Sequence, residues 1–144
     1  MIIYRIARAL HQELDGEGAR QTGGRWNSPG TAVVYASSTR ALAALEYLVH
    51  IDIDEVPDDL VLISVEVPDD LSVENVADDV SGGSAERSAG DAWARAGRSV
   101  VLGVPSRVIP EERNYVINPR HPSAGGVRVV HVRGFVFDER LVAG

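Results

Sequence analysis

The sequence predicts a single α+β domain whose sheet is antiparallel or mixed. Short apolar runs typical of strands are interspersed with two helical patterns, and they lack the regular alternation of a doubly wound parallel sheet. A chain of 144 residues fits one domain, and no internal repeat or linker divides it. We therefore expect residues 1–144 to form one domain.

Four runs of apolar and β-branched residues predict strands, and a longer run predicts a last strand or a bent hairpin. In chain order these segments are residues 2–7, 32–36, 60–67, 99–104 and 127–137. The third is the clearest, because Pro57 and Pro68 bound it on either side.

Two segments predict helices. The first runs to about His50; the Ser-Ser-Thr sequence at 37–39 offers its N-cap, and Ala, Leu and Glu dominate it. The second covers residues 85–97 and ends at Gly97, and we expect Trp93 on this helix to lie in the core.

Three glycine- or proline-rich segments predict loops. Residues 10–30 contain five glycines and predict a long functional loop around a short helix, since long loops within a compact domain tend to carry sites. Residues 78–90 predict a flexible connector, and residues 115–122 a proline-punctuated turn.

The composition excludes several chemistries. The chain has no Cys, which rules out thiolate nucleophiles, disulfides and cysteine metal sites. All 14 basic residues are Arg, so a Schiff-base lysine and a Walker A loop are also excluded. A net charge of −7 argues against a general nucleic-acid binder. No apolar run could cross a bilayer and no signal peptide is evident, so we expect a cytoplasmic protein with no membrane association.

The charge is unevenly distributed along the chain. Residues 1–40 carry +2, residues 41–86 carry −13 and residues 87–144 carry +4. One interpretation is a solvated acidic face with Pro-Asp-Asp turns. The alternative is that arginines from both ends converge on an anionic small molecule, while the acidic segment meets a basic partner.

Glu46 is the most informative single position. On the predicted helix up to His50, Leu42, Leu45 and Val49 form an apolar stripe that Ala41 and Leu48 widen, and Glu46 falls on the border of that stripe. A carboxylate at such a border is either tied into a structural salt bridge or opens into a cleft beside the core.

Two arginines stand out by their context. Arg25 lies in the glycine-rich stretch 23–30, where glycines allow close backbone approach and a guanidinium can bind phosphate oxygens in a bidentate manner. Arg5 lies within an apolar strand and needs a partner, so it is a candidate second phosphate ligand or a partner for Glu46.

Other polar residues follow predicted strands. Tyr35 could stack on a planar ring or lie in the core, and Ser106 is expected to form hydrogen bonds rather than act as a nucleophile. Asn118 and His121 lie in a rigid Pro-bounded turn. The four histidines show no metal-ligand spacing, so we expect no metal.

Together these segments resemble the RES domain family, named for an Arg, a Glu and a Ser. The resemblance covers nearly the whole chain, and the three name-giving residues would fall on Arg25, Glu46 and Ser106. The matching stretches are Tyr4-Arg5-Ile6-Ala7, Gly23-Gly24-Arg25-Trp26-Asn27, Val33-Val34-Tyr35-Ala36-Ser37, Leu42 to His50, Val104-Pro105-Ser106 and Asn118-Pro119-Arg120-His121-Pro122.

The resemblance implies a bacterial type II toxin that forms a hetero-oligomer with an Xre-like antitoxin, through which alone it would meet DNA. It also implies a fold similar to that of ADP-ribosyltransferase toxins. NAD+ would be its substrate, with no separate cofactor, and the nicotinamide–ribose bond would be cleaved by hydrolysis or phosphorolysis. Alternatives are ADP-ribosyl transfer to a protein and a non-catalytic nucleotide- or partner-binding domain.

The resemblance also assigns roles to the singled-out residues. Glu46 would stabilise the oxocarbenium-like ribose, and Arg5 and Arg25 would bind the pyrophosphate. Tyr35 would stack on nicotinamide. The ribose or the carboxamide would be bound by Ser106 and Asn118, and His121 would also contact NAD+. The catalytic residues would be Glu46, Arg25 and Ser106.

Overall fold

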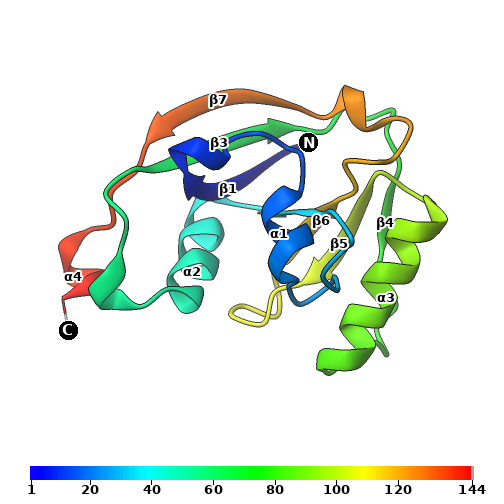
Figure 1. Ribbon diagram of the computed structural model, residues 1–144, viewed down its shortest axis with the longest axis horizontal. Helices are drawn as coiled ribbons and strands as arrows, with labels where there is room; N and C mark the ends of the chain where they lie inside the picture. The colour runs from blue at the N-terminus through cyan, green and yellow to red at the C-terminus, as the bar shows by residue number, and fades with distance from the viewer. Residues whose placement is uncertain (144) are drawn as a thin grey trace.

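Within residues 1–143, which the computed structural model describes, seven strands form one mixed sheet in the order β4-β5-β6-β2-β1-β3-β7 (Figure 1). Only the pair β4–β5 is parallel. The α+β class predicted from the sequence is confirmed. The strands are β1 (Ile2–Arg8), β2 (Val34–Ser37), β3 (Leu60–Glu66), β4 (Val73–Asn75), β5 (Val101–Pro105), β6 (Arg113–Ile117) and β7 (Arg128–Gly134). The α-helices are α1 (Glu17–Thr22), α2 (Arg40–His50), α3 (Gly83–Ala96) and α4 (Glu139–Val142).

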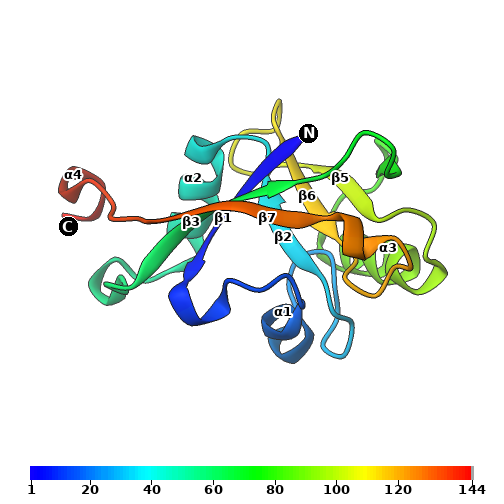
Figure 2. The same cartoon turned by 90° about the horizontal axis from the view of Figure 1, so that it is seen from above.

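The sheet consists of two halves that meet at a single residue pair. Strands β1 and β2 are in register only at Tyr4 and Ser37, whereas β1 pairs with β3 over seven residues. Strands β1 and β2 are therefore paired over only a very short stretch. Both halves are twisted, and the view from above shows their strands crossing (Figure 2). This junction is where the sheet leaves room for a cavity.

Helices α2 and α3 cover the same face of the sheet. Cross-strand partners lie on one face, so Leu62 shares its face with Ile6 on β1, and Leu102 shares its face with Val116 and Tyr35. Ile6 and Leu62 pack against Ala43 of α2, and Leu102 packs against Trp93 of α3. In Figure 1 the two helices lie on either side of β5 and β6, which leaves the face between them open.

The opposite face is closed by connections rather than by long helices. Its core contains Ile3, Ile63, Val65 and Val101, with Leu71 from the β3–β4 connection packed against it. Strand β7 forms the far edge of this half, and every one of its residues is exposed. Tyr35 and Ser37 belong to the helical face, whereas Arg5 starts from the opposite face, because its cross-strand partner is Ile63.

Several elements differ from the expectations. Residues 115–117, predicted as part of a turn, belong to β6, and β4 was not predicted. Helix α3 begins at Gly83, inside the predicted connector. Strands β4 and β6 are short, so the alternation of apolar and polar residues within each is too brief to predict a strand. They form because β5 lies between them and pairs with both.

The predicted apolar stripe of α2 is also partly wrong. Leu42 is 1% exposed, but Val49 is 58% exposed and Ala41 is exposed as well. The helix instead packs through Ala43, with Tyr47 and Leu48 partly buried beside it. Its N-cap is Thr39, whose hydroxyl accepts a hydrogen bond from the Leu42 amide at 3.0 Å, as the sequence predicted.

Candidate active site

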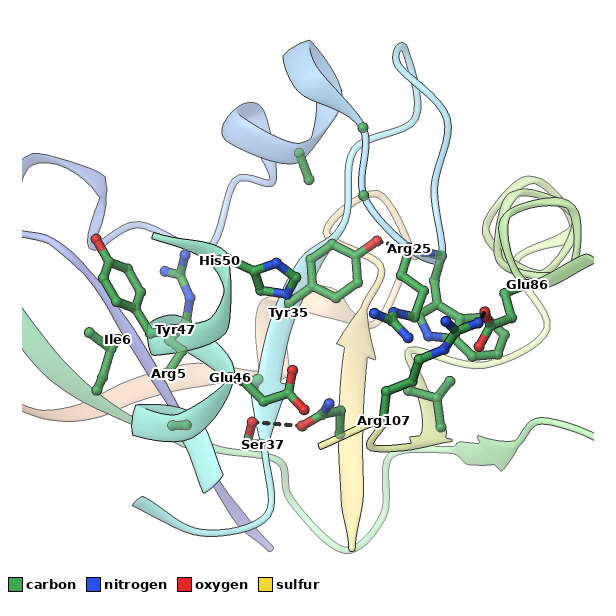
Figure 3. Close-up of a pocket in the computed structure, with 18 of the residues that line it drawn as sticks. Arg5, Ile6, Arg25, Tyr35, Ser37, Glu46, Tyr47, His50, Glu86 and Arg107 are labelled. Atoms are coloured by element: carbon green, nitrogen blue, oxygen red, sulfur yellow. Dashed lines mark hydrogen bonds and ion pairs between the residues drawn. The ribbon is translucent and has the colours of Figure 1, made fainter. Parts of the chain in front are cut away.

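A cavity of about 630 Å³ opens on the helical face where the two halves of the sheet meet. Its size is that of a pocket for an extended small ligand. Figure 3 shows its walls, which come from β1, β2, α2, α3 and the loops at 23–26 and 105–107. Its charged lining residues are Arg5, Arg25, Glu46, Glu86, Arg87 and Arg107. With four arginines against two glutamates, the cavity suits an anionic ligand although the chain is acidic.

The carboxylate of Glu46 points into this cavity from α2 (Figure 3). Its Oε1 accepts a hydrogen bond of 2.6 Å from Oγ of Ser106. That hydroxyl oxygen in turn accepts bonds from the backbone amides of Val108 and Ile109, at 3.1 and 3.0 Å. The Oε2 atom makes no hydrogen bond to the residues that the structure describes. Glu46 is thus held on one oxygen and available on the other.

Ser106 supports the site from beneath. It is 2% exposed and is absent from the cavity wall, which passes over its neighbours Pro105 and Arg107. The sequence predicted hydrogen bonding for Ser106, and the structure shows it. Its partner is Glu46, so the geometry favours a positioning role over the direct ribose contact that we expected.

Arg25 holds the least satisfied group of the site. Its guanidinium lines the cavity, and its Nη1 atom is buried without any hydrogen-bond partner among residues 1–143. A buried donor that lacks a partner costs about 1–3 kcal/mol. Nη1 lies beside the cavity but is closed off from it, so an acceptor on a ligand reaches this atom only after the guanidinium turns toward the cavity.

The loop that carries Arg25 is fixed by Tyr35. The phenol oxygen accepts a 2.9 Å bond from the Trp26 amide and donates a 2.6 Å bond to Oδ1 of Asn27. Burial raises the pKa of Tyr35 to about 12, so the phenol stays protonated as a donor. A Cβ at Gly24 would lie 2.8 Å from this phenol oxygen, which explains the glycine.

Helix α3 fixes the other side of the same loop. A Cβ on Gly90 would overlap the carbonyl oxygen of Trp26, so only glycine allows this approach of helix and loop. The next residue of α3, Asp91, accepts bonds from the amide and hydroxyl of Ser28, at 2.8 and 2.5 Å. The loop carrying Arg25 is therefore part of the rigid frame.

Arg5 occupies a different part of the cavity from Arg25. Figure 3 shows Tyr35 and Glu46 between the two guanidinium groups. Arg5 donates a 3.2 Å bond to the carbonyl of His11, and burial lowers its pKa from the ordinary value, an effect that Asp15 opposes. The alternative that Arg5 pairs with Glu46 has no support in this geometry.

Asn118 and His121 lie outside the cavity wall. Asn118 is 3% exposed; its amide donates to the Ala94 carbonyl at 3.1 Å and accepts from the Arg120 amide at 3.0 Å. His121 accepts a 3.0 Å bond from the Ser123 amide through Nδ1. These contacts hold the turn after β6, and the substrate contacts we expected of both residues are not supported.

Sequence reasoning missed several lining residues. The largest omission is the ion pair between Arg107 and Glu86, whose atoms Nη2 and Oε1 are 2.7 Å apart. Glu86 was placed in a flexible connector, so its burial could not be foreseen. Other missed lining residues are Tyr4, Ser37, Tyr47, His50, Arg87 and Asn114. Of these, Asn114 on β6 accepts a 2.7 Å bond from the hydroxyl of Ser37, its cross-strand partner on the neighbouring strand β2. Nothing in the sequence around either residue indicates this pairing.

Residues 1–143 hold no group of three or more His, Asp or Glu residues arranged to bind a metal ion. None of the helices in that part of the chain is both long enough and apolar enough to cross a membrane.

Comparison with known proteins identifies the family to which this fold belongs. A family model of the RES domain matches residues 2–139, and the chain belongs to the RES domain family. The Prs ADP-ribosylating toxin of a Sphingobium species is 42% identical over 140 residues, covering 90% of this chain and 87% of that protein.

A second relative and one solved structure agree. Toxin Res of Pseudomonas putida is 35% identical over 147 residues, covering 98% of this chain and 99% of its own length. A chain of the crystal structure of the M. tuberculosis MbcT–MbcA toxin–antitoxin complex superimposes with a TM-score of 0.75 at 18% identity. That similarity covers 93% of this chain and 83% of that chain, and it shows a shared fold.

Proposed function

We propose that this RES domain protein is a toxin that cleaves the nicotinamide–ribose bond of NAD+. The observation that carries the proposal is that one cavity of about 630 Å³ is lined both by the Glu46 carboxylate and by Arg25, whose Nη1 atom has no hydrogen-bond partner among residues 1–143. NAD+ needs both groups, because its pyrophosphate is anionic and its ribose becomes cationic when the nicotinamide leaves.

The bond cleavage requires little from the protein beyond charge and position. The C1′–N bond breaks heterolytically, and its electron pair goes to the ring nitrogen, which turns a pyridinium into neutral nicotinamide. Positive charge then develops at C1′ and the ring oxygen. The free Oε2 of Glu46 would stabilise that charge or hold a ribose hydroxyl, while Ser106 fixes the direction of the carboxylate.

Arg25 would bind the pyrophosphate. Its Nη1 atom lacks a partner in the free protein, and a phosphate oxygen supplies one of the strongest acceptors available. The loop that carries Arg25 is held by hydrogen bonds to Tyr35 and Asp91, so it would keep the guanidinium in place before the ligand arrives. Tyr35, on the same wall, presents a ring for stacking on the nicotinamide.

Two acceptors for the ADP-ribosyl group are considered. The first is a small molecule: water adds to C1′ and loses a proton to give ADP-ribose, or inorganic phosphate adds to give ADP-ribose 1″-phosphate. The second is a protein, and the 42% identical relative named an ADP-ribosylating toxin favours this candidate. Both share the first step and the same carboxylate.

Incubation of free protein with adenine-labelled NAD+ separates these acceptors. Labelled ADP-ribose, or its 1″-phosphate when phosphate is present, supports degradation. A discrete labelled protein band in a lysate supports transfer. If NAD+ stays intact in buffer, with phosphate and in lysate, the proposal fails; nucleotide binding without turnover would then indicate the non-catalytic alternative.

We also propose that the partner is an Xre-like antitoxin that covers the cavity and joins the chain in a hetero-oligomer. The similarity in fold to a chain of a toxin–antitoxin complex supports this proposal. Co-purification with the product of the neighbouring gene, followed by the same NAD+ assay, tests it. A stable complex without activity is expected, and a complex with full activity contradicts the proposal.

A further inference from the structure

Charged groups follow one another along the cavity in a definite order. Figure 3 shows Tyr47 and Arg5 at one end, Glu46 and Tyr35 in the middle, and Arg25, Arg107 and Glu86 toward the other end. Beyond Glu46, a cationic stretch is followed by a second carboxylate. The proposed function assigns roles to Glu46 and to the cations but leaves Glu86 unexplained.

Glu86 is unusually buried for a carboxylate that lines a cavity. It is 4% exposed and lies in the first turn of α3, and Oε1 accepts the 2.7 Å bond from Arg107. Its Oε2 makes no hydrogen bond within residues 1–143. Among residues 1–143, Nη1 of Arg25 is the one completely buried side-chain nitrogen or oxygen without a partner, so the unpaired Oε2 of Glu86 keeps some exposure, and Glu86 lines the cavity. Burying a carboxylate is costly, so a free oxygen turned to a cavity needs a use.

We propose that Glu86 binds the hydroxyls of the adenosine ribose and thereby selects NAD+ over NADP+. The inference rests on the proposed function and extends it to the far half of the dinucleotide. NAD+ presents a ribose, two phosphates and a second ribose in that order. The cavity presents Glu46, then Arg25, then Glu86 with its partner Arg107, which is the complementary order.

The chemistry of the two nucleotides differs at one place. An ionised carboxylate only accepts hydrogen bonds, so it pairs with the 2′- and 3′-hydroxyls of the adenosine ribose. In NADP+ the 2′-hydroxyl is replaced by a phosphate, which has no donor to offer and repels the carboxylate. The salt bridge to Arg107 leaves one oxygen free, so a bound ribose adds to that pair and does not displace it.

The cavity also contains groups that could favour NADP+. Arg87 and Arg107 line the same end, and guanidinium groups bind a 2′-phosphate well. Arg107 is committed to Glu86, however, and Arg87 is exposed, where a single ion pair contributes little. The balance therefore favours the ribose, and a preference for NADP+ is the outcome that would overturn the inference.

The test measures kcat/KM for both nucleotides. Wild-type protein is expected to use NAD+ at least about tenfold better than NADP+, the factor that one hydrogen bond to a charged group provides. In Glu86→Gln the amide keeps a hydrogen-bonding group but loses the charge, so this preference should fall about tenfold or more. The matched control is Glu66→Gln, which removes a carboxylate paired with Arg128 far along β3 and should keep the wild-type ratio.

Two readouts keep the outcomes separate. If neither nucleotide is consumed, the proposed function fails, whether or not the nucleotides bind. If NAD+ is consumed but the ratio is near one, favours NADP+ or is unchanged in Glu86→Gln, only this inference fails. Titration of Glu46→Gln protein with each nucleotide, with and without Glu86→Gln, gives the same ratio by affinity. A variant that partly misfolds would lose activity on both nucleotides equally, so the ratio of its two kcat/KM values would not change.

Discussion

The hydroxyl of Ser106 donates a 2.6 Å hydrogen bond to Oε1 of Glu46, linking two residues that are 60 positions apart in the chain. The loop after β5 thereby fixes the carboxylate of α2, and two backbone amides fix the hydroxyl. Glu46 reaches the cavity with one oxygen oriented and the other free. Ser106 and Glu46 therefore form one hydrogen-bonded unit at the wall of the cavity.

Removing the hydroxyl should therefore reduce turnover more than binding. In Ser106→Ala, Glu46 loses its donor and two backbone amides lose an acceptor, so we expect kcat to fall about 10- to 100-fold with KM nearly unchanged. The free energy of unfolding should also fall by about 1–3 kcal/mol. Steady-state kinetics and denaturant unfolding measure the two effects. A raised KM with unchanged kcat would indicate that Ser106 contacts substrate directly.

Replacing Arg25 should separate stability from function. Arg25→Met removes a guanidinium whose Nη1 is buried and unpaired, so the free energy of unfolding should rise by about 1 kcal/mol, while nucleotide affinity falls about 10-fold or more. Arg25→Lys should not restore affinity, because an ammonium cannot bind the pyrophosphate in a bidentate manner.

The control for this pair is Arg98→Met. Arg98 is exposed and forms a salt bridge with Glu74 outside the cavity, so stability should change by less than about 1 kcal/mol and affinity should be kept. Unfolding curves and calorimetric titration measure both properties. Loss of stability in Arg25→Met together with unchanged affinity would contradict a ligand-binding role.

Tyr35 should make the protein sensitive to alkaline pH. Its pKa is raised to about 12 from 10.0, so the folded state holds the phenol proton more tightly than the unfolded chain. The corresponding stability is fully present below pH 10 and is lost as the pH rises from 10 to 12, by at most about 3 kcal/mol. Tyr35→Phe should lack this part of the loss. Parallel unfolding curves of the two proteins at pH 10–12 would contradict the assignment.

Gly90 should tolerate no side chain. In Gly90→Ala the Cβ overlaps the Trp26 carbonyl, so α3 and the loop carrying Arg25 must separate, and we expect a loss of more than about 2 kcal/mol. Gly18→Ala in α1 is the control; no atom lies within 4 Å of its Cβ, and stability should rise by about 0.5–1 kcal/mol. Thermal unfolding of both variants decides the matter, and equal melting temperatures would contradict the close packing.

The sequence predicted the parts of the site that depend on local pattern. Glu46 follows from its place at the border of an apolar helix face, and Arg25 from the glycines around it. The β1, β3 and α2 segments also carry their own signals in apolar runs and a Thr39 cap. Local periodicity is sufficient where an element buries its own face.

The remaining parts depend on contacts between distant segments. Asn118 looked functional because it is polar and lies in a rigid turn, yet the Ala94 carbonyl satisfies its amide. Glu86 looked like part of a solvated connector, yet Arg107 and the packing of α3 bury it. Neither partner can be read from neighbouring residues, because each pair joins α3 to a residue that follows β5 or β6, and only the packing of α3 against those strands brings them together.

The most direct test of the account is nicotinamide release from NAD+ by the free protein, compared with Glu46→Gln. Wild-type protein should release nicotinamide stoichiometrically with NAD+ loss, and the variant should be at least about 100-fold slower while still binding NAD+ by titration. No nicotinamide release by the wild type would contradict the claim that the protein cleaves this bond. Equal rates for the two proteins would contradict the claim that Glu46 stabilises the developing charge.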